Sequence, residues 1–264
     1  MPIETVSVAG LRGFSAKQSL RLAAPDGEAG SGLTVLVGPN GGGKSTIIEA
    51  FRALASRRSV SFSDGKRNKL ADDRVAIAVV VDSKAYELRT VDRGGSETVW
   101  VPERPSSLVW YILPSRRVFN PYFGEGENNR EMYISNQQLP NTRGEHTNEF
   151  SQRLFHALRH REEFDSVMGR VVRPVPEWTI DRSDQGAFFI KVNADGQYHN
   201  SDGLGEGIVS LLFIIDAVYE SRPNDLIVVD EPELSLHPAL QGRLLQLLAE
   251  YARDAVSRRW SVAR

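Results

Sequence analysis

Apolar and polar residues alternate along the start of the chain, and the period then changes. The alternation over residues 3–9, taken up again before Leu22, predicts two half-buried strands. Residues 33–37 are apolar almost throughout, which predicts a short strand covered on both faces. Residues 45–54 carry apolar side chains at helical spacing, so a helix is expected directly after a glycine-rich loop.

The middle of the chain is rich in β-branched residues separated by turn residues. Three such runs predict an antiparallel meander: residues 75–81, 85–91 and 98–101. An apolar run at residues 108–113 predicts a further strand. Residues 56–73 are basic and polar, which favours a solvated loop over a phosphate-contacting patch, and residues 119–148 have little periodicity and predict a long irregular segment.

The last part of the chain mixes helical and strand patterns. Apolar side chains at helical spacing predict helices at residues 150–168, 207–219 and 238–251. Short β-rich runs predict strands at residues 178–180, 187–192 and 226–229. Asp195-Gly196 stands where a hairpin turn is expected. Strands and helices alternate at both ends of the chain, so we expect an α/β fold.

Composition and charge are those of an ordinary globular protein. Of the 264 residues, 41% are hydrophobic and 25% are charged, and the formal net charge of −2 gives no overall basic field for nucleic acid. The absence of cysteine excludes disulfides, cysteine-ligated zinc and cysteine nucleophiles. No apolar stretch approaches the ~20 residues of a membrane span, and the N-terminus lacks the pattern of a signal peptide, so we expect a cytoplasmic protein without a membrane partner.

The glycine-rich loop carries the most specific motif. Residues 38–46 read Gly-Pro-Asn-Gly-Gly-Gly-Lys-Ser-Thr, which contains the full phosphate-loop (Walker A) pattern. Glycines allow successive N–H groups to point at phosphate oxygens, and the N-terminus of the next helix favours the same negative charge. In this pattern Lys44 contacts the β- and γ-phosphates, and the Ser45 hydroxyl ligates Mg²⁺. We therefore predict that ATP is bound by Gly38, Pro39, Asn40, Gly41, Gly42, Gly43, Lys44, Ser45 and Thr46.

Two carboxylates follow the apolar run at residues 226–229. Asp230 and Glu231 stand at its end, as in a Walker B motif. Adjacent side chains of an extended segment point in different directions, so the two acids can have different roles. We predict that Asp230 ligates Mg²⁺ and that Glu231 is the catalytic residue that orients or deprotonates the attacking water. An Asp-Glu pair suits ABC- and AAA-type ATPases better than Ras-type GTPases.

Three further segments carry a resemblance to the ATP-binding cassette (ABC) superfamily. Residues 200–207, Asn-Ser-Asp-Gly-Leu-Gly-Glu-Gly, precede a predicted apolar helix and resemble the signature motif of that superfamily. Residues 230–238, Asp-Glu-Pro-Glu-Leu-Ser-Leu-His-Pro, are similar to the Walker B motif and D-loop of its cytosolic branch, and residues 8–14 resemble the first strand of the same branch. That branch includes RecF- and SMC-type heads and the ATPase domain of the overcoming-lysogenization-defect (OLD) family.

The resemblance implies a P-loop NTPase fold with a mainly parallel core sheet, an antiparallel β subdomain and a helical insertion. It implies a single ABC-type ATPase domain over residues 1–264. Residues 1–55 and 185–253 would form its nucleotide-binding core. Residues 56–184 would hold the β-meander, the irregular segment and the helical insertion.

The resemblance also implies a homodimer that holds two ATP molecules between its heads. Ser201 and Gly203 of one copy would then touch the γ-phosphate bound by the other copy. Apart from the resemblance, the same two residues fit an N-cap and a turn before a helix. His237 falls at the position of a D-loop contact in the dimer, which we favour over a role as metal ligand or base.

The sequence departs from the pattern of the family at several points. No switch histidine on a further strand precedes Arg264, so the motifs predict nucleotide binding more directly than hydrolysis. Gln137 and Gln138 fall in the region of the Q-loop glutamine, and Arg116 and Arg117 are equally suited to phosphate or interdomain contacts. We expect neither the TOPRIM nuclease domain of OLD-type proteins nor an SMC-type coiled-coil arm.

The motifs together predict an ATP-binding and ATP-hydrolysing ABC-type ATPase that dimerises on ATP and drives or gates a partner. DNA repair and anti-phage defence are the expected settings, with DNA or a nuclease or effector protein as partner. Two alternatives stay open. One is a nucleotide-sensing regulator with little turnover. The other is the ATP-binding subunit of a transporter, which the form of the signature disfavours.

Overall fold

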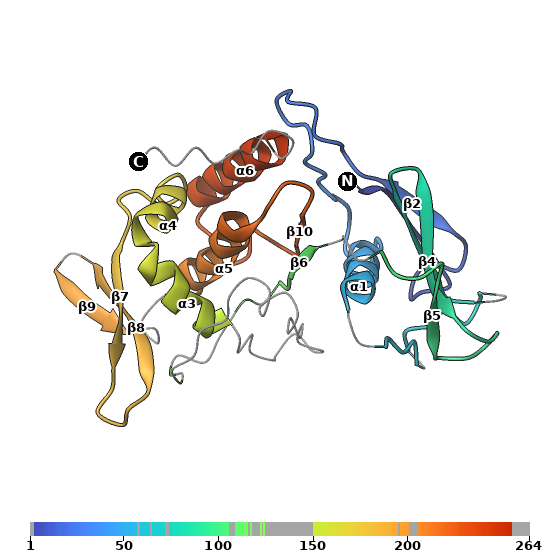
Figure 1. Cartoon of the computed structure of the whole chain (residues 1–264), viewed down its shortest axis with the longest axis horizontal. Coiled ribbons are helices and arrows are strands. Elements are labelled where there is room, and N and C mark those ends of the chain that lie inside the picture. The colour runs from blue at the N-terminus through green and yellow to red at the C-terminus, as the bar shows by residue number, and fades with distance from the viewer. Residues whose placement is uncertain are drawn as a thin grey trace. The chain divides into compact units, whose positions relative to one another are not determined.

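The computed structural model describes residues 3–56, 59–63, 65–71, 74–105, 109–115, 117, 122, 124, 150–194, 196–200 and 205–254 (Figure 1). The chain divides into two compact units. The first comprises Met1–Trp110, Arg222–Val228 and Ala249–Arg264, and the second comprises Tyr111–Ser221 and Val229–Leu248. The single domain expected over residues 1–264 stays a prediction. The irregular segment expected at residues 119–148 lies almost wholly outside the described residues.

The first unit contains a five-stranded sheet in the order β2-β1-β3-β4-β5. Its strands are β1 (Ile3–Ala9), β2 (Gln18–Arg21), β3 (Ala76–Val81), β4 (Lys84–Thr90) and β5 (Thr98–Val101). All neighbours pair antiparallel, with Val6 opposite Val79 and Ile77 opposite Leu88. Alternate residues of β3 are buried, as expected for a strand with one face on the core. The predicted opening strands and meander are confirmed.

Helix α1 (Lys44–Ala55) is amphipathic and confirms the helix predicted at residues 45–54. Its buried side holds Ile47, Ala50, Phe51 and Leu54. Elsewhere on the helix, Glu49 forms ion pairs with Arg12 and Lys66, each at 3.3 Å. These pairs join α1 to the loop between β1 and β2, which carries Arg12, and to the loop between α1 and β3, which carries Lys66.

The strand predicted at residues 33–37 is wrong. The segment has no strand pairing, and its Val35 and Val37 are 61% and 89% exposed. A strand forms only where a neighbour completes its ladder of hydrogen bonds. The described sheet of this unit ends in β2 and β5, and residues 33–37 pair with neither. The apolar pattern of residues 33–37 therefore predicted a burial that Val35 and Val37 do not have.

The second unit is built around helix α5 (Glu206–Glu220), which is buried from Val209 to Val218. The other elements are α3 (Phe150–Arg159), α4 (Arg161–Met168), most of α6 (Pro238–Arg253), and a three-stranded antiparallel sheet of β7 (Glu177–Arg182), β8 (Phe188–Ala194) and β9 (Gln197–Asn200). The ring of Phe150 in α3 stacks on Phe213 in α5, with centroids 3.7 Å apart. Although α5 is strongly apolar, no helix in the described part of the chain has both the length and the hydropathy to cross a bilayer.

The single helix predicted at residues 150–168 is two helices, α3 and α4. His160 leaves the helical region, with φ −110° and ψ 37°, and stands as the N-cap residue of α4. Hydrogen bonds from His160 N to His156 O (3.3 Å) and from Phe164 N to His160 O (3.0 Å) keep the i to i−4 pattern across the bend. The apolar spacing therefore continues through the break, which is why periodicity alone did not reveal it.

Strands β6 (Trp110–Leu113) and β10 (Leu226–Val229) pair with each other. Leu226 N donates to Val109 O and Asp230 N donates to Leu113 O, both at 3.0 Å. The two bonds advance in the same direction along both strands, which is the pattern of a parallel pair. Every other strand pair among the described residues is antiparallel. The predicted core sheet that is mainly parallel therefore stays a prediction.

Candidate nucleotide-binding site

The phosphate loop runs from an exposed segment into the N-terminus of α1. Gly41 and Gly43 have φ values of 80° and 93°, which side-chain-bearing residues rarely adopt. Lys44 turns back over the loop, and its Nζ donates to the carbonyl oxygens of Gly38 (2.6 Å) and Pro39 (2.9 Å). A Cβ atom placed on Gly38 or Gly41 would meet no atom within 4 Å. The loop therefore has an open outer side with a cation folded against it.

The groups at this loop fit the phosphates of a nucleotide. The first N–H groups of a helix have no partner within the helix and carry a partial positive charge, which favours an anion. Ser45 is exposed in the first turn of α1, where its hydroxyl is available to a hard cation such as Mg²⁺. Thr46 is only 5% exposed, and its N–H donates to Gly43 O at 3.0 Å. The Thr46 side chain thus belongs to the core side of α1.

Phe14 packs against the start of the same helix. A Cβ atom at Gly43 would lie 2.6 Å from two carbon atoms of the Phe14 ring. The Phe14 N–H donates to Leu11 O at 2.9 Å, which fixes the tight turn that carries the ring. From the sequence, Phe14 was only part of a motif that resembles a first strand. In the structure it is the reason that residue 43 has no room for a side chain.

The Walker B carboxylates follow β10. Asp230 is half-buried and Glu231 is exposed. Glu231 has φ 48°, in the left-handed region that residues other than glycine, asparagine and aspartate seldom occupy. Its carbonyl oxygen accepts a hydrogen bond from Leu234 N at 3.1 Å, which closes a tight turn. Glu231 therefore sits at a strained turn and not on an extension of the strand.

The segment after these carboxylates lies against the first turn of α5. A Cβ atom at Gly207 would collide with the carbonyl oxygen of Ser235. The Ser235 hydroxyl donates to Glu206 Oε2 at 3.2 Å. Ser201 and Gly203, the residues predicted for the signature, lie outside the described residues.

His237 caps the next helix. Its Nδ1 accepts a hydrogen bond from Ala239 N at 3.3 Å, and Gln241 Nε2 donates to Leu236 O at 2.9 Å. These contacts organise the entry into α6. A contact of His237 across a dimer interface stays a prediction.

Comparison with known proteins agrees with these features. Residues 105–259 match the family described as "AAA domain, putative AbiEii toxin, Type IV TA system". Residues 5–168 match a second family, described as "AAA domain". Each match covers more than half of the chain. The chain belongs to these AAA domain families.

A solved structure agrees with this family at the level of the fold. The SMC head domain from Thermotoga maritima matches the AAA domain with a TM-score of 0.50 and 14% sequence identity, over 96% of this chain and 86% of that chain. At that identity the match shows a shared fold. No curated protein matches the chain. The resemblance to ATPase heads of the RecF/SMC-like branch, with their P-loop NTPase fold, is thereby confirmed.

Arg117 of the AAA domain has a role that the sequence did not reveal. The sequence suggested a phosphate or interdomain contact, but Arg117 is 3% exposed and its contacts lie within the second unit. Its Nε donates to Ser210 Oγ (2.7 Å), its Nη1 to the carbonyl oxygens of Pro114 and Asp230 (2.7 Å each), and its Nη2 to Glu231 O (3.0 Å).

Burial lowers the pKa of Arg117 to about 10, while the nearby carboxylates of Asp230, Glu233 and Glu231 act in the opposite direction. The guanidinium therefore keeps its charge at neutral pH. The neighbouring Arg116 and the two glutamines considered for the Q-loop, Gln137 and Gln138, lie outside the described residues.

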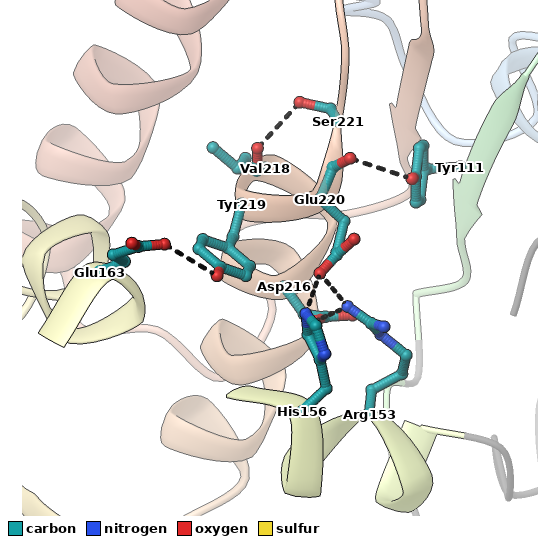
Figure 2. A network of polar contacts seen from close by, with 9 residues as sticks. All are labelled: Tyr111, Arg153, His156, Glu163, Asp216, Val218, Tyr219, Glu220 and Ser221. Carbon is teal, nitrogen blue, oxygen red and sulfur yellow. Dashed lines mark hydrogen bonds and ion pairs between the residues drawn. The ribbon is translucent and has the colours of Figure 1, made fainter. Parts of the chain in front are cut away.

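A buried charge cluster joins α3 to α5 in the same unit (Figure 2). Arg153, 1% exposed in its side chain, pairs with Asp216 at 3.4 Å and with Glu220. Glu220 also pairs with His156 at 3.3 Å. Burial raises the pKa of Asp216 to about 6, although Arg153 acts in the opposite direction. The one sequence signal for this cluster was an aspartate inside the apolar run of α5.

Proposed function

We propose that the chain is an ATPase head that binds ATP and Mg²⁺ at the phosphate loop, hydrolyses the ATP and dimerises on it to drive or gate a partner. The observation that carries this proposal is the loop itself. The Lys44 ammonium lies on the carbonyl oxygens of Gly38 and Pro39, beside the N-terminus of α1 and below an open outer side. A lysine ammonium and a helix N-terminus together favour a polyphosphate ligand. Membership of the AAA domain families supports a nucleotide as that ligand.

Each group has a distinct task in this proposal. Backbone N–H groups of the glycine-rich loop hold the phosphates, and Lys44 gives up its two carbonyl contacts for β- and γ-phosphate oxygens. The Ser45 hydroxyl and the Asp230 carboxylate would hold Mg²⁺, as the two motifs imply, and Mg²⁺ would offset the negative charge of the phosphates. Glu231 orients the attacking water and accepts its proton. Asp230 and Glu231 are adjacent, so one turn of the chain supplies both tasks.

The dimer and the setting rest on the family resemblance. Ser201 and Gly203 of a second copy complete the site, and ATP binding thereby controls the association of two heads. The description of the first matching family names a toxin of a type IV toxin–antitoxin system. That description supports defence as the setting, ahead of DNA repair. A nuclease or effector protein, or DNA, is the partner that the dimer would act on.

Lys44→Ala tests the binding half of the proposal. Loss of the ammonium removes the cation that faces the β- and γ-phosphates, so affinity for a fluorescent ATP analogue should become unmeasurable. Lys84→Ala changes an exposed lysine at the start of β4 and should leave the affinity unchanged. Equal affinity in the Lys44→Ala variant and the wild type would sink the assignment of the loop.

Glu231→Gln tests the hydrolysis half. The amide cannot accept the proton of water, so turnover should fall by about 100-fold or more while ATP binding is kept. The stalled protein should elute as a dimer on size-exclusion chromatography with ATP. Glu103→Gln, at an exposed position after β5, is the control. Wild-type protein that binds ATP without turnover would favour the nucleotide-sensing regulator instead.

A further inference from the structure

We propose that Arg117 is a positioning residue for ATP hydrolysis, which ties the backbone of Asp230 and Glu231 to helix α5 and so sets the direction of the Glu231 carboxylate. The inference rests on the proposed function, because it assumes that Glu231 acts on the attacking water. It goes beyond that function because Arg117 belongs to none of the motifs that predicted the site.

The contacts of Arg117 are unusual for a buried cation. Burying a guanidinium is unfavourable unless its N–H groups find acceptors. Here the hydrogen bonds of all three guanidinium nitrogens go to neutral groups: the carbonyl oxygens of Pro114, Asp230 and Glu231, and the hydroxyl of Ser210. A planar guanidinium can hold such acceptors in fixed directions, whereas a lysine ammonium is a single point with flexible donors. The arrangement therefore suits a residue that fixes three chain segments relative to one another.

The backbone that Arg117 holds is strained. Glu231 has φ 48°, a conformation that persists only where surrounding contacts enforce it. Two donors converge on its carbonyl oxygen: Arg117 Nη2 at 3.0 Å and Leu234 N at 3.1 Å. Among the described residues, removing the guanidinium leaves the turn bond from Leu234 N as the remaining hydrogen bond to the Glu231 carbonyl oxygen. The Glu231 side chain projects from that turn, so a relaxed backbone would redirect its carboxylate.

The other end of the tie is helix α5. Ser210 lies on the second turn of α5 and is 5% exposed, so its hydroxyl has little freedom to find other partners. One turn earlier, Gly207 leaves room for the Ser235 carbonyl, and Glu206 accepts from the Ser235 hydroxyl. Helix α5 thus contacts the Walker B turn on both sides, through Arg117 before it and through Ser235 after it. A displacement of α5 must therefore displace Glu231.

Arg117→Lys and Ser210→Ala test this role by steady-state kinetics. Arg117→Lys keeps the charge but loses the planar guanidinium that holds its acceptors in fixed directions, so kcat should fall by about tenfold or more. KM and the affinity for the ATP analogue should stay within about twofold, because neither residue belongs to the phosphate loop. Ser210→Ala removes one hydrogen bond and should lower kcat by about two- to fivefold. Arg243→Lys, whose exposed guanidinium donates to Val171 O, is the matched control and should match the wild type.

Combining Arg117→Lys with Glu231→Gln separates positioning from a general loss of structure. If Arg117 acts through Glu231, the double variant should be no slower than Glu231→Gln alone. A further tenfold loss in the double variant would overturn the inference.

Hydrogen exchange of the nucleotide-free protein provides a measurement that does not depend on turnover. Arg117→Lys should raise exchange in peptides that cover residues 206–212 and 230–236 together, and Arg243→Lys should not. If exchange rises in Arg117→Lys but the wild type does not hydrolyse ATP, the ATPase proposal is overturned. The contact of Arg117 with the Walker B turn is then still supported. If the wild type hydrolyses ATP, and neither Arg117→Lys nor Ser210→Ala changes kcat or exchange, the inference is overturned. If Arg117→Lys does not fold, Ser210→Ala decides by the same two measurements.

Discussion

Replacing Arg153 by methionine should strongly destabilise the second unit. The side chains of Arg153, Asp216 and Glu220 are 1%, 2% and 9% exposed. Methionine fills most of the arginine volume but leaves two buried carboxylates without their guanidinium. Removing one partner of a buried ion pair costs about 3–5 kcal/mol of unfolding free energy. We expect a loss in that range at pH 7.

The loss should grow with pH, and the sign follows from the protonation of Asp216. In the wild type the pKa of Asp216 is raised from 3.8 to about 6, first by burial and against the effect of Arg153. Its contribution to stability therefore falls from about pH 4 to pH 6 and is constant above. Without Arg153 the folded pKa of Asp216 rises further, so the decline continues above pH 6 at about 1.4 kcal/mol per pH unit. The gap between wild type and variant should widen by up to about 3 kcal/mol from pH 6 to pH 8.

Urea unfolding followed by circular dichroism at pH 6, 7 and 8 measures this gap. Arg161→Met is the matched control in the same unit, because Arg161 pairs with Asp165 at 3.1 Å but is 37% exposed. An exposed pair contributes little, so the control should lose less than about 1 kcal/mol at every pH. A loss below about 1 kcal/mol for Arg153→Met at pH 7, or one that is constant from pH 6 to 8, would refute the reasoning.

Two glycine positions give further predictions. Gly207→Ala places a methyl group against the Ser235 carbonyl and should lower the unfolding free energy by about 1–3 kcal/mol, seen as a lower Tm; an unchanged Tm would contradict the close approach. Gly43→Ala meets the Phe14 ring and the unfavourable φ of 93°, so ATP affinity should fall, and adding Phe14→Leu should restore part of it. No recovery in the double variant would mean that the backbone conformation, and not the ring, forbids a side chain there.

Much of the secondary structure was predictable, because it depends on local patterns. The alternation that predicted residues 75–81 is the alternation of buried residues in β3. The apolar run at 226–229 became β10 with the same bounds. In these segments the neighbours that the pattern required are present in the fold.

The two failures have different physical causes. Residues 33–37 have the composition of a buried strand, but a strand also needs a pairing partner, and its own residues do not specify one. At His160 the i to i−4 hydrogen bonds continue across the break, so the spacing of the apolar residues does not change there.

The candidate site was predictable where its residues are contiguous in the sequence and unpredictable where they are far apart. The phosphate loop was predictable because its glycines, Lys44 and the following helix are contiguous, and the structure brings them together. Arg117 was not predictable, because the sequence does not reveal that this arginine is buried. Asp216 was visible as a polar residue in an apolar helix, but its partner Arg153 stands 63 residues away.

The identity of a Walker B motif and its geometry are therefore separate properties of this chain. Strand β10 has four residues, and its end places Asp230 and Glu231 at the same point whatever their orientation. The orientation depends on a left-handed turn that Arg117 holds from 114 residues away. A chain that kept both carboxylates but lost Arg117 would still carry the motif in its sequence. It would lack the contact that directs the carboxylate of Glu231. When this AAA domain is compared with related chains, Arg117 should therefore be checked together with Asp230 and Glu231.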